Sequence, residues 1–174
     1  MQELQLPLSP ETIQSLTSGQ AVYLTGTIFT ARDCAHKRLI ESIQKNTSPI
    51  PLQDAAIYYA GPCPTPPDRV SGSCGPTTSM RMDSFTPALL QQGVRILIGK
   101  GERSQAVRDA IQQYKAIYFA AIGGAGAIYG DCIQSNELVA YPDLLSEGIY
   151  KLQVKNFPCI VAIDCKGNTI YREK

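Results

Sequence analysis

Short apolar runs alternate with segments of helical periodicity along the whole chain. Residues 94–99 and 116–122 are almost continuously apolar, which is typical of strands buried on both faces. Residues 31–45 and 104–114 place apolar side chains three and four positions apart, which predicts amphipathic helices. This alternation predicts an α/β fold, with α+β as the alternative. The other predicted strands are residues 21–29, 55–61 and 137–141.

Polar residues and a glycine mark the expected ends of two helices. Thr30 and Asp33 predict a capping box at the start of the first helix. Thr77 or Thr78 is expected to cap a later helix that Gly93 ends. Both helices would therefore begin shortly after a strand ends, where α/β sheets bind their ligands.

Proline and glycine divide the rest of the chain. Residues 62–69 contain four prolines and cannot form regular structure. Residues 157–164 and 168–173 flank a Lys-Gly-Asn turn, which predicts a terminal hairpin. The chain shows no internal repeat and no second domain boundary, so we expect residues 1–174 to form a single compact domain.

The composition excludes several classes of protein. A hydrophobic content of 44% with 18% charged residues argues against intrinsic disorder. Sixteen Lys and Arg against fifteen Asp and Glu give a formal net charge of +1, which argues against a nucleic-acid partner bound through a broad basic surface. No apolar run approaches the roughly 20 residues that a membrane helix needs, so no membrane partner is expected.

The six cysteines do not predict a metal site, because none forms a Cys-x-x-Cys pair. The segment MQELQLPLSP lacks the basic start and apolar stretch of a signal peptide, which predicts a cytoplasmic protein with reduced thiols. We expect most cysteines to be buried and none to act as a nucleophile, since no base is paired with them. They are Cys34, Cys63, Cys74, Cys132, Cys159 and Cys165.

Three cations fall at predicted element ends. Arg32 and Arg81 lie in first helical turns, where the helix dipole disfavours a cation unless an anion is near. Lys100 stands between two glycines at the end of a buried strand. With the hydroxyls of Thr77 and Thr78, these cations suit a small dicarboxylate, because a guanidinium binds a carboxylate through two parallel hydrogen bonds.

Ordinary surface ion pairs are the alternative for each of these cations. Taken singly, each cation favours such a pair, which contributes little to stability, whereas the repeated pattern favours a shared pocket. The pairs would be Arg32 with Asp33 or Glu41, Arg81 with Asp83, and Lys100 with Glu102.

Two further features remain open. His36, the single histidine, lies one helical turn after Arg32 and is either an acid or base in the pocket or a buried residue that orients a loop. Residues 123–127 (GGAGA) suggest a dinucleotide-binding loop, but Tyr129 stands where the third glycine would be. A tight strand-to-helix turn with close backbone packing is the preferred interpretation.

Four segments carry a resemblance to a known family: residues 30–38 (TARDCAHKR), 58–62 (YYAGP), 71–83 (SGSCGPTTSMRMD) and 99–101 (GKG). They resemble the β subunit, or C-terminal domain, of class I iron–sulfur hydro-lyases, which are the oxygen-sensitive fumarases and the L(+)-tartrate dehydratases. The resemblance extends from about residue 4 to near the C-terminus. Its Gly-Pro-Thr-Thr-x-x-Arg-Met block is far more specific than a glycine-rich loop.

The resemblance implies a swivelling β/β/α domain that supplies half of an active site. In this family an α subunit supplies the other half, with three cysteines that hold a 4Fe-4S cluster and a fourth iron open to substrate. The six cysteines of this chain would then not be cluster ligands, and no metal is expected on the chain itself. The implied partners are an iron–sulfur α subunit, in a hetero-oligomer, and a small dicarboxylate substrate.

The resemblance also implies roles for the candidate residues. Arg32, Arg81 and Lys100 would hold the carboxylates of malate or fumarate, a clamp that suits a carbanion-like intermediate. Thr77 and Thr78 would lie beside the reacting carbons. Thr77 is the family's candidate for proton abstraction from malate C3, for which a base from the α subunit must take the threonine proton. The open iron would act as a Lewis acid on the C2 hydroxyl.

The resemblance leaves a choice between two hydro-lyases. Fumarate hydratase is the preferred prediction, and L(+)-tartrate dehydratase is the runner-up. A non-catalytic carboxylate-binding or assembly module is the alternative of another class, although pure assembly would not require the full set of cations and threonines. The segments closer to fumarases are residues 58–62, 71–73, 81–84 and 122–124.

Overall fold

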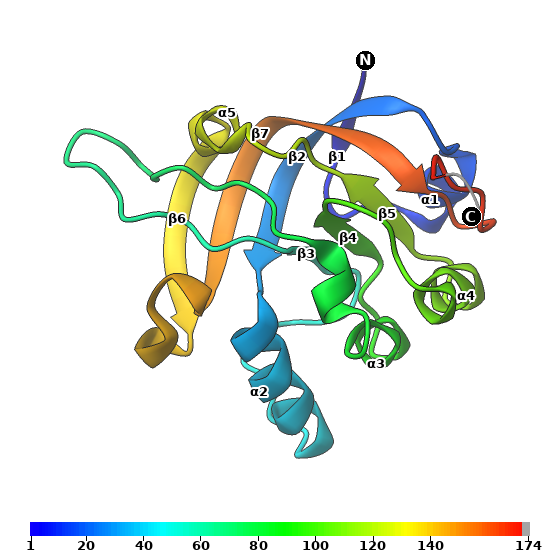
Figure 1. The fold of residues 1–174 in the computed structure, drawn as a ribbon, viewed down its shortest axis with the longest axis horizontal. Helices are drawn as coiled ribbons and strands as arrows, with labels where there is room; N and C mark the ends of the chain where they lie inside the picture. Colours follow the sequence, from blue (N-terminus) through cyan, green and yellow to red (C-terminus); the bar gives the residue numbers. More distant parts are fainter. Residues whose placement is uncertain (172–174) are drawn as a thin grey trace.

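The structure, a computed structural model, describes residues 1–171 and contains a seven-stranded sheet with helices around it (Figure 1). The strands are β1 (Gln2–Gln5), β2 (Ala21–Thr30), β3 (Ala56–Tyr58), β4 (Ile96–Gly99), β5 (Ile117–Ala120), β6 (Ile133–Ala140) and β7 (Ile149–Ile163). The α-helices are α1 (Pro10–Ser15), α2 (Asp33–Gln44), α3 (Thr86–Gln91), α4 (Gln105–Gln113) and α5 (Gly126–Asp131). Two 3₁₀ helices are η1 (Ser79–Met82) and η2 (Pro142–Glu147).

Most of the sheet closes into a small barrel. The strand order is β1-β2-β3-β4-β5-β7-β6, with parallel pairing from β1 through β5. β7 pairs antiparallel with both β5 and β2, which joins β2, β3, β4, β5 and β7 into a closed ring. Because β2 to β5 are parallel, their carboxyl ends lie at one end of the barrel. The α/β class is confirmed in this small, compact form.

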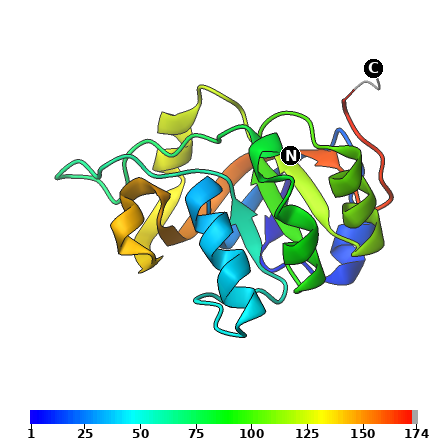
Figure 2. The ribbon, with the colours of Figure 1, turned by 60° about the horizontal axis from the view of Figure 1, so that its bottom comes forward.

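Apolar side chains fill the barrel and also cover its outer wall. Tyr58, Ile96 and Ile98 belong to the cluster inside the barrel, whereas the alternate residues Ile57 and Leu97 pack on the outside against helices. Helices α2, α3 and α4 lie along one side of the sheet (Figure 2). Both faces of β3 and β4 are therefore buried, as the continuous apolar run in β4 predicts.

The first predicted helix forms, but its predicted capping box is wrong. α2 begins at Asp33 with Arg32 at the N-cap position, and no side chain caps it. Thr30 is fully buried, and its hydroxyl accepts a hydrogen bond from the Tyr150 amide at 3.0 Å. This hydroxyl is therefore committed to β7 and is not available to the amides of α2.

The helix predicted between Thr77 and Gly93 divides into η1 and α3. Thr78 occupies the N-cap position of η1, but its hydroxyl makes no capping bond. Gly93 follows α3 with a φ of +107°, and a Cβ there would collide with Gln53. The glycine thus ends the helix as predicted, whereas the threonine cap does not form.

The end of the chain differs from the predicted hairpin. β7 covers Ile149–Ile163 and starts well before the predicted segment. After the turn, the returning chain forms a bridge between Ile163 and Thr169 rather than a second strand. Arg172 and Glu173, which belong to the predicted hairpin, lie outside the described residues.

Candidate active site

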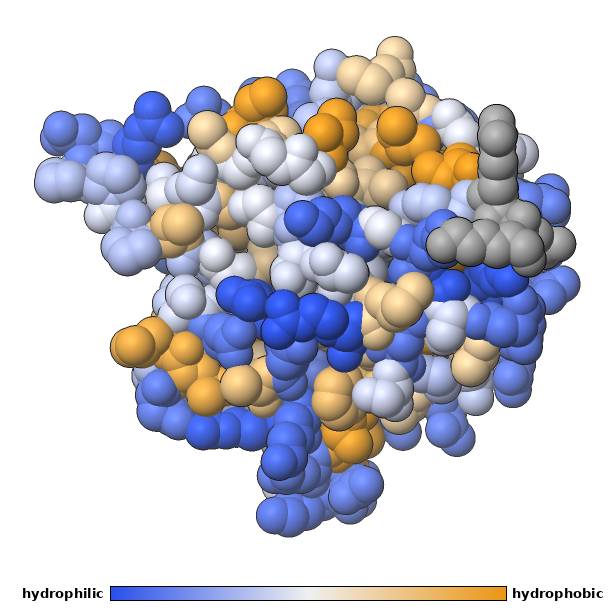
Figure 3. Space-filling view, viewed as in Figure 1, coloured by the Kyte–Doolittle hydropathy of each residue, from blue (hydrophilic) through white to orange (hydrophobic). Residues whose placement is uncertain are grey.

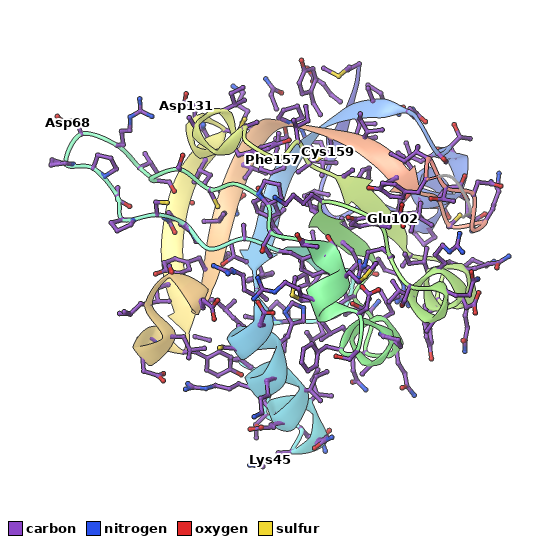
Figure 4. All side chains as sticks on the ribbon, viewed as in Figure 1. Lys45, Asp68, Glu102, Asp131, Phe157 and Cys159 are labelled. Atoms are coloured by element: carbon purple, nitrogen blue, oxygen red, sulfur yellow. The ribbon has the colours of Figure 1, made fainter. Side chains whose placement is uncertain are left out.

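The predicted site residues lie in the loops that follow the parallel strands. Arg32 follows β2, residues 77–81 follow β3, and Lys100 follows β4. The glycine turn at residues 123–126 follows β5. Since these strands end together, their loops meet at one end of the barrel (Figure 1), and Figure 4 labels Glu102 on the β4 loop there.

The segment that carries the two threonines lies across the ends of β3 and β4. The Thr77 amide donates to the main-chain oxygen of Tyr59 at 2.7 Å, and the Ser79 amide donates to that of Lys100 at 2.9 Å. Thr78 itself forms a bridge with Lys100. The backbone is therefore bonded on its inner side, while Thr77 is half-buried and Thr78 exposed.

Lys100 extends over the glycine turn. A Cβ on Gly123 would lie 3.4 Å from Lys100 Cδ and 3.7 Å from its Nζ. No carboxylate among residues 1–171 pairs with this ammonium, so the ordinary pair with Glu102 does not form. The Lys100 side chain therefore extends from the threonine segment toward the β5 loop, and no carboxylate among the described residues occupies its donors.

Both arginines are paired, but not with the carboxylates expected from local spacing. Arg81 Nε donates to Asp33 Oδ1 at 2.9 Å, and Arg32 Nη2 lies 3.3 Å from Glu147 Oε1. Asp33 is the first residue of α2 and directly follows Arg32. It therefore ties η1 to the start of α2 and brings the two arginines to the same side of the barrel end.

Asp83, the expected partner of Arg81, points inward instead. Its Oδ1 accepts a hydrogen bond from Arg103 Nε at 2.7 Å, and the Arg103 side chain is 0% exposed. Sequence reasoning missed both Arg103 and Glu147. The sequence around neither residue points to its partner. Glu147 is more than one hundred residues from Arg32, and for Asp83 the nearer Arg81 is the obvious partner rather than Arg103.

His36 is fully buried and orients the start of α2. Its Nδ1 lies 2.9 Å from the main-chain oxygen of Arg32, so Nδ1 carries the proton and donates it. Burial lowers the pKa of His36 to about 4, aided by the positive charge of Arg103 and opposed by the hydrogen bond to Arg32. The ring is therefore neutral near pH 7 and shielded from solvent, which fits the orienting interpretation.

The glycine turn at residues 123–126 allows two backbone segments to pack closely. Gly124 has a φ of +83°, and a Cβ on Gly126 would lie 3.1 Å from the amide nitrogen of Gly75. The Cys74 amide donates to the main-chain oxygen of Gly126 at 2.9 Å. The close backbone packing predicted for this turn is confirmed, and it holds the β5 loop against the segment leading to Thr77.

The cysteines are dispersed rather than gathered. Three are buried, two are exposed and one is half-buried, so fewer are buried than expected. Burial raises the pKa of Cys74 to about 12 and that of Cys159 well above its usual range. Within residues 1–171, no three His, Cys, Asp or Glu side chains are grouped to hold a metal ion. The described residues thus do not fit an iron–sulfur cluster.

Apolar side chains border the candidate site. Met80 is 51% exposed on η1, and Ile122 is 59% exposed beside the glycine turn. Figure 3 shows hydrophilic residues across the middle of this face and apolar residues above them, near α5 and β7. The loop at residues 62–69 projects away from the barrel, with Asp68 at its tip (Figure 4). None of the helices in the described part of the chain combines the length and apolar character that a membrane crossing requires.

Comparisons with known proteins agree on one family. A sequence model of the family described as "Fumarase C-terminus" matches residues 2–174. "Fumarate hydratase class I, aerobic" from Escherichia coli (strain K12) is 42% identical over 153 residues, which cover 86% of this chain and 28% of that protein. "Fumarate hydratase 2" from Leishmania major is 40% identical over 157 residues, or 88% of this chain and 28% of that protein.

A shorter relative matches over most of its own length. "L(+)-tartrate dehydratase subunit beta" from Escherichia coli (strain K12) is 36% identical over 179 aligned positions, which cover 98% of this chain and 86% of that subunit. The chain thus spans less than a third of the fumarate hydratases named above but nearly all of this subunit. Given the match over residues 2–174 and the resemblance in the loops at the barrel end, this chain belongs to the fumarase C-terminus family.

Proposed function

We propose that residues 1–174 form the β-subunit domain of a class I fumarate hydratase, a hydro-lyase that interconverts fumarate and (S)-malate together with an iron–sulfur α subunit. The observation that supports this proposal is the placement of Arg32, Arg81, Lys100 and two threonines in the loops that follow β2, β3 and β4 at one barrel end. The two relatives described above that are named fumarate hydratase are 42% and 40% identical to the chain.

The three cations supply the dicarboxylate site. Each arginine is held by one protein carboxylate and keeps further N–H donors for a ligand, while Lys100 has no carboxylate partner among residues 1–171. Fumarate carries a carboxylate at each end, so cations from separate loops suit it better than a single cation would. Thr78, exposed beside Lys100, adds a hydroxyl donor.

Thr77 is the proposed residue for proton transfer at malate C3. Its amide is anchored to Tyr59, which fixes the backbone while the side chain stays half-buried. A threonine hydroxyl is a weak base, and no group among residues 1–171 accepts a hydrogen bond from Thr77 Oγ1. The missing base therefore belongs to the partner in this proposal.

The 4Fe-4S cluster also belongs to the partner in this proposal, because the described residues offer no ligand set for it. Most of the length of the fumarate hydratase relatives lies outside the match to this chain. A separate α subunit takes that place, and the assembly is a hetero-oligomer. The exposed side chains of Met80 and Ile122 at the rim of the site suit contact with this partner, and a swivelling placement of the domain would bring the barrel end against it.

L(+)-tartrate dehydratase is the second candidate function. One observation favours it: the relative with that name is itself a β subunit, and the chain matches 86% of its length. Tartrate is also a dicarboxylate, so the same cations suit it. Its second hydroxyl, on C3, must be accommodated by groups that malate does not need.

Anaerobic turnover assays test the proposal. The chain is assayed alone and then mixed with a reconstituted iron–sulfur α subunit, with fumarate and L(+)-tartrate as parallel substrates. Fumarate hydration only in the mixture is the expected result. Turnover of tartrate alone would move the function to the second candidate, and no turnover of either would leave a non-catalytic carboxylate-binding or assembly module.

A further inference from the structure

The domain completely buries one arginine beside the candidate site. The side chain of Arg103 is 0% exposed. Its Nε donates to Asp83 Oδ1 and its Nη2 to Thr86 Oγ1, both at 2.7 Å. The rings of Tyr59 and Tyr118 face its guanidinium carbon at 5.1 and 5.0 Å from their centroids. Burying a cation is unfavourable unless such partners replace the lost water.

Both tyrosines beside the guanidinium also contact the candidate site, Tyr59 through its main chain and Tyr118 through its ring hydroxyl. The main-chain oxygen of Tyr59 accepts the Thr77 amide at 2.7 Å. The Tyr118 hydroxyl donates to the main-chain oxygen of Gly101 at 2.8 Å and therefore accepts its other bond, of 2.9 Å, from the Ser79 hydroxyl. Two anchors of the threonine segment and one of the lysine loop thus come from these two tyrosines, whose rings pack on the guanidinium of Arg103.

The ion pair secures the far end of the same segment. Asp83 directly follows η1, and its Oδ2 accepts the Ser104 amide at 2.6 Å. Thr86, bonded to the guanidinium, donates its own proton to the main-chain oxygen of Met82 at 2.9 Å. Arg103 therefore connects the last residue of η1 with the loop between β4 and α4, which begins at Lys100.

We propose that Arg103 is a positioning residue, which fixes residues 77–83, and with them Thr77 and Arg81, against the loop that carries Lys100. This inference rests on the proposed function, because it assigns a role within the same site. The stability of the fold does not explain why Arg103 and Asp83 form a buried ion pair, because apolar side chains of similar volume often stabilise a core equally well. An apolar side chain could not replace the directional bonds, however. The planar guanidinium donates to Asp83 and Thr86 in fixed directions, and the rings of Tyr59 and Tyr118 pack against it.

Kinetics of the reconstituted enzyme test the role. Arg103→Met removes all the hydrogen-bond donors of the side chain. Arg103→Lys keeps the positive charge but not the planar guanidinium. Asp83→Asn weakens the ion pair with a side chain of the same size as aspartate. Arg95→Met is the matched control: Arg95 Nη1 donates to the main-chain oxygens of Leu90 and Val94 near the opposite end of β4. Urea unfolding gives the folded fraction of each preparation.

For the Arg103→Met holoenzyme we expect kcat/KM to fall about 100-fold per folded molecule, with KM raised and kcat lowered. The kcat/KM of Arg103→Lys should lie between those of Arg103→Met and wild type. Arg95→Met should lower the free energy of unfolding but leave kcat and KM unchanged. If Arg103→Met, or Arg103→Lys where the first does not fold, keeps wild-type kcat and KM per folded molecule, Arg103 is structural only and the inference is wrong.

A second readout separates this inference from the proposed function. Hydrogen exchange of the Thr77 and Ser79 amides is measured in the chain alone, where no turnover is needed. Arg103→Lys should speed exchange at both amides by about tenfold, whereas Arg95→Lys should not. If the wild-type mixture is inactive on both substrates, the proposed function fails. The exchange rates then decide whether Arg103 fixes this segment, and unchanged rates refute that role.

Discussion

Substitution of Arg81 by alanine separates ligand binding from stability. Arg81 Nε donates to Asp33 Oδ1 at 2.9 Å, and the two side chains are 52% and 30% exposed. An ion pair this exposed contributes about 0.2–1 kcal/mol. We therefore expect Arg81→Ala to lower the free energy of unfolding by no more than about 1 kcal/mol.

The same substitution should affect turnover far more. A hydrogen bond to a charged group contributes about 1.5–3 kcal/mol in a site shielded from water. Since about 1.4 kcal/mol corresponds to a tenfold change in rate, kcat/KM should fall about 10- to 150-fold. The assay is the initial rate of anaerobic fumarate hydration with the α subunit present, and urea unfolding of the same preparation gives its stability.

Arg69→Ala is the matched control for this experiment. Arg69 pairs with Asp131 at 2.8 Å, and their side chains are 57% and 66% exposed, but the pair links the projecting loop to α5. Arg69→Ala should lower the free energy of unfolding as little as Arg81→Ala does, and its kcat/KM should equal that of wild type. The carboxylate-clamp assignment is refuted if kcat/KM of Arg81→Ala stays within about threefold of wild type, or if the control loses as much.

Three further outcomes follow from particular contacts. Thr77→Ala should lower kcat much more than it raises KM in steady-state assays, and a retained kcat removes Thr77 from proton transfer. Gly99→Ala should destabilise the domain by about 1–3 kcal/mol in urea unfolding, because its Cβ would overlap Ser79 Oγ, whereas Gly123→Ala, with its nearest atom at 3.4 Å, should change little. His36 has a folded pKa of about 4 against 6.5 in the unfolded chain, so the unfolded chain binds the extra proton between these values. Stability should therefore fall by up to about 3 kcal/mol as the pH is lowered from 6.5 to 4, and this dependence should be absent in His36→Gln.

Local pattern predicted the central strands but not the long strand β7. Pro158 and Asn156, which has a φ of +53°, interrupt the pattern, so a strand beginning at residue 157 is the natural prediction. In the structure, the pairing of β7 with β2 shifts register near this point, and the Asn156 amide donates to Thr25 Oγ1 at 3.0 Å. β7 therefore carries one extra residue opposite β2 at this point, a β-bulge that lets the strand continue and that the local pattern of residues 149–156 does not reveal. The short elements β1 and α1 were missed because neither is long enough to show periodicity.

The candidate site could be predicted as a set of residues but not as a set of contacts. Arg81 and Asp83 are close in sequence, yet Arg81 lies on η1 and Asp83 directly after it, and residues two apart on such a helical turn point in different directions. Arg81 consequently reaches Asp33 on α2, while Asp83 turns inward to Arg103. These pairs depend on how the barrel brings its loops together, which is tertiary information.

In the proposed site, the arginine pairs that add little to stability would still matter for binding. Each guanidinium is ordered before substrate arrives, Arg81 by Asp33 and Arg32 by Glu147. Ordering a long side chain upon binding costs about 0.5–1.5 kcal/mol, so two arginines held in advance remove a cost that would otherwise weaken the complex. The carboxylates also offset the mutual repulsion of cations gathered at one barrel end. Under the proposed function, a dianion that enters would therefore meet donors already in place, and its affinity would depend on the geometry that Asp33 and Glu147 maintain as well as on the number of cations.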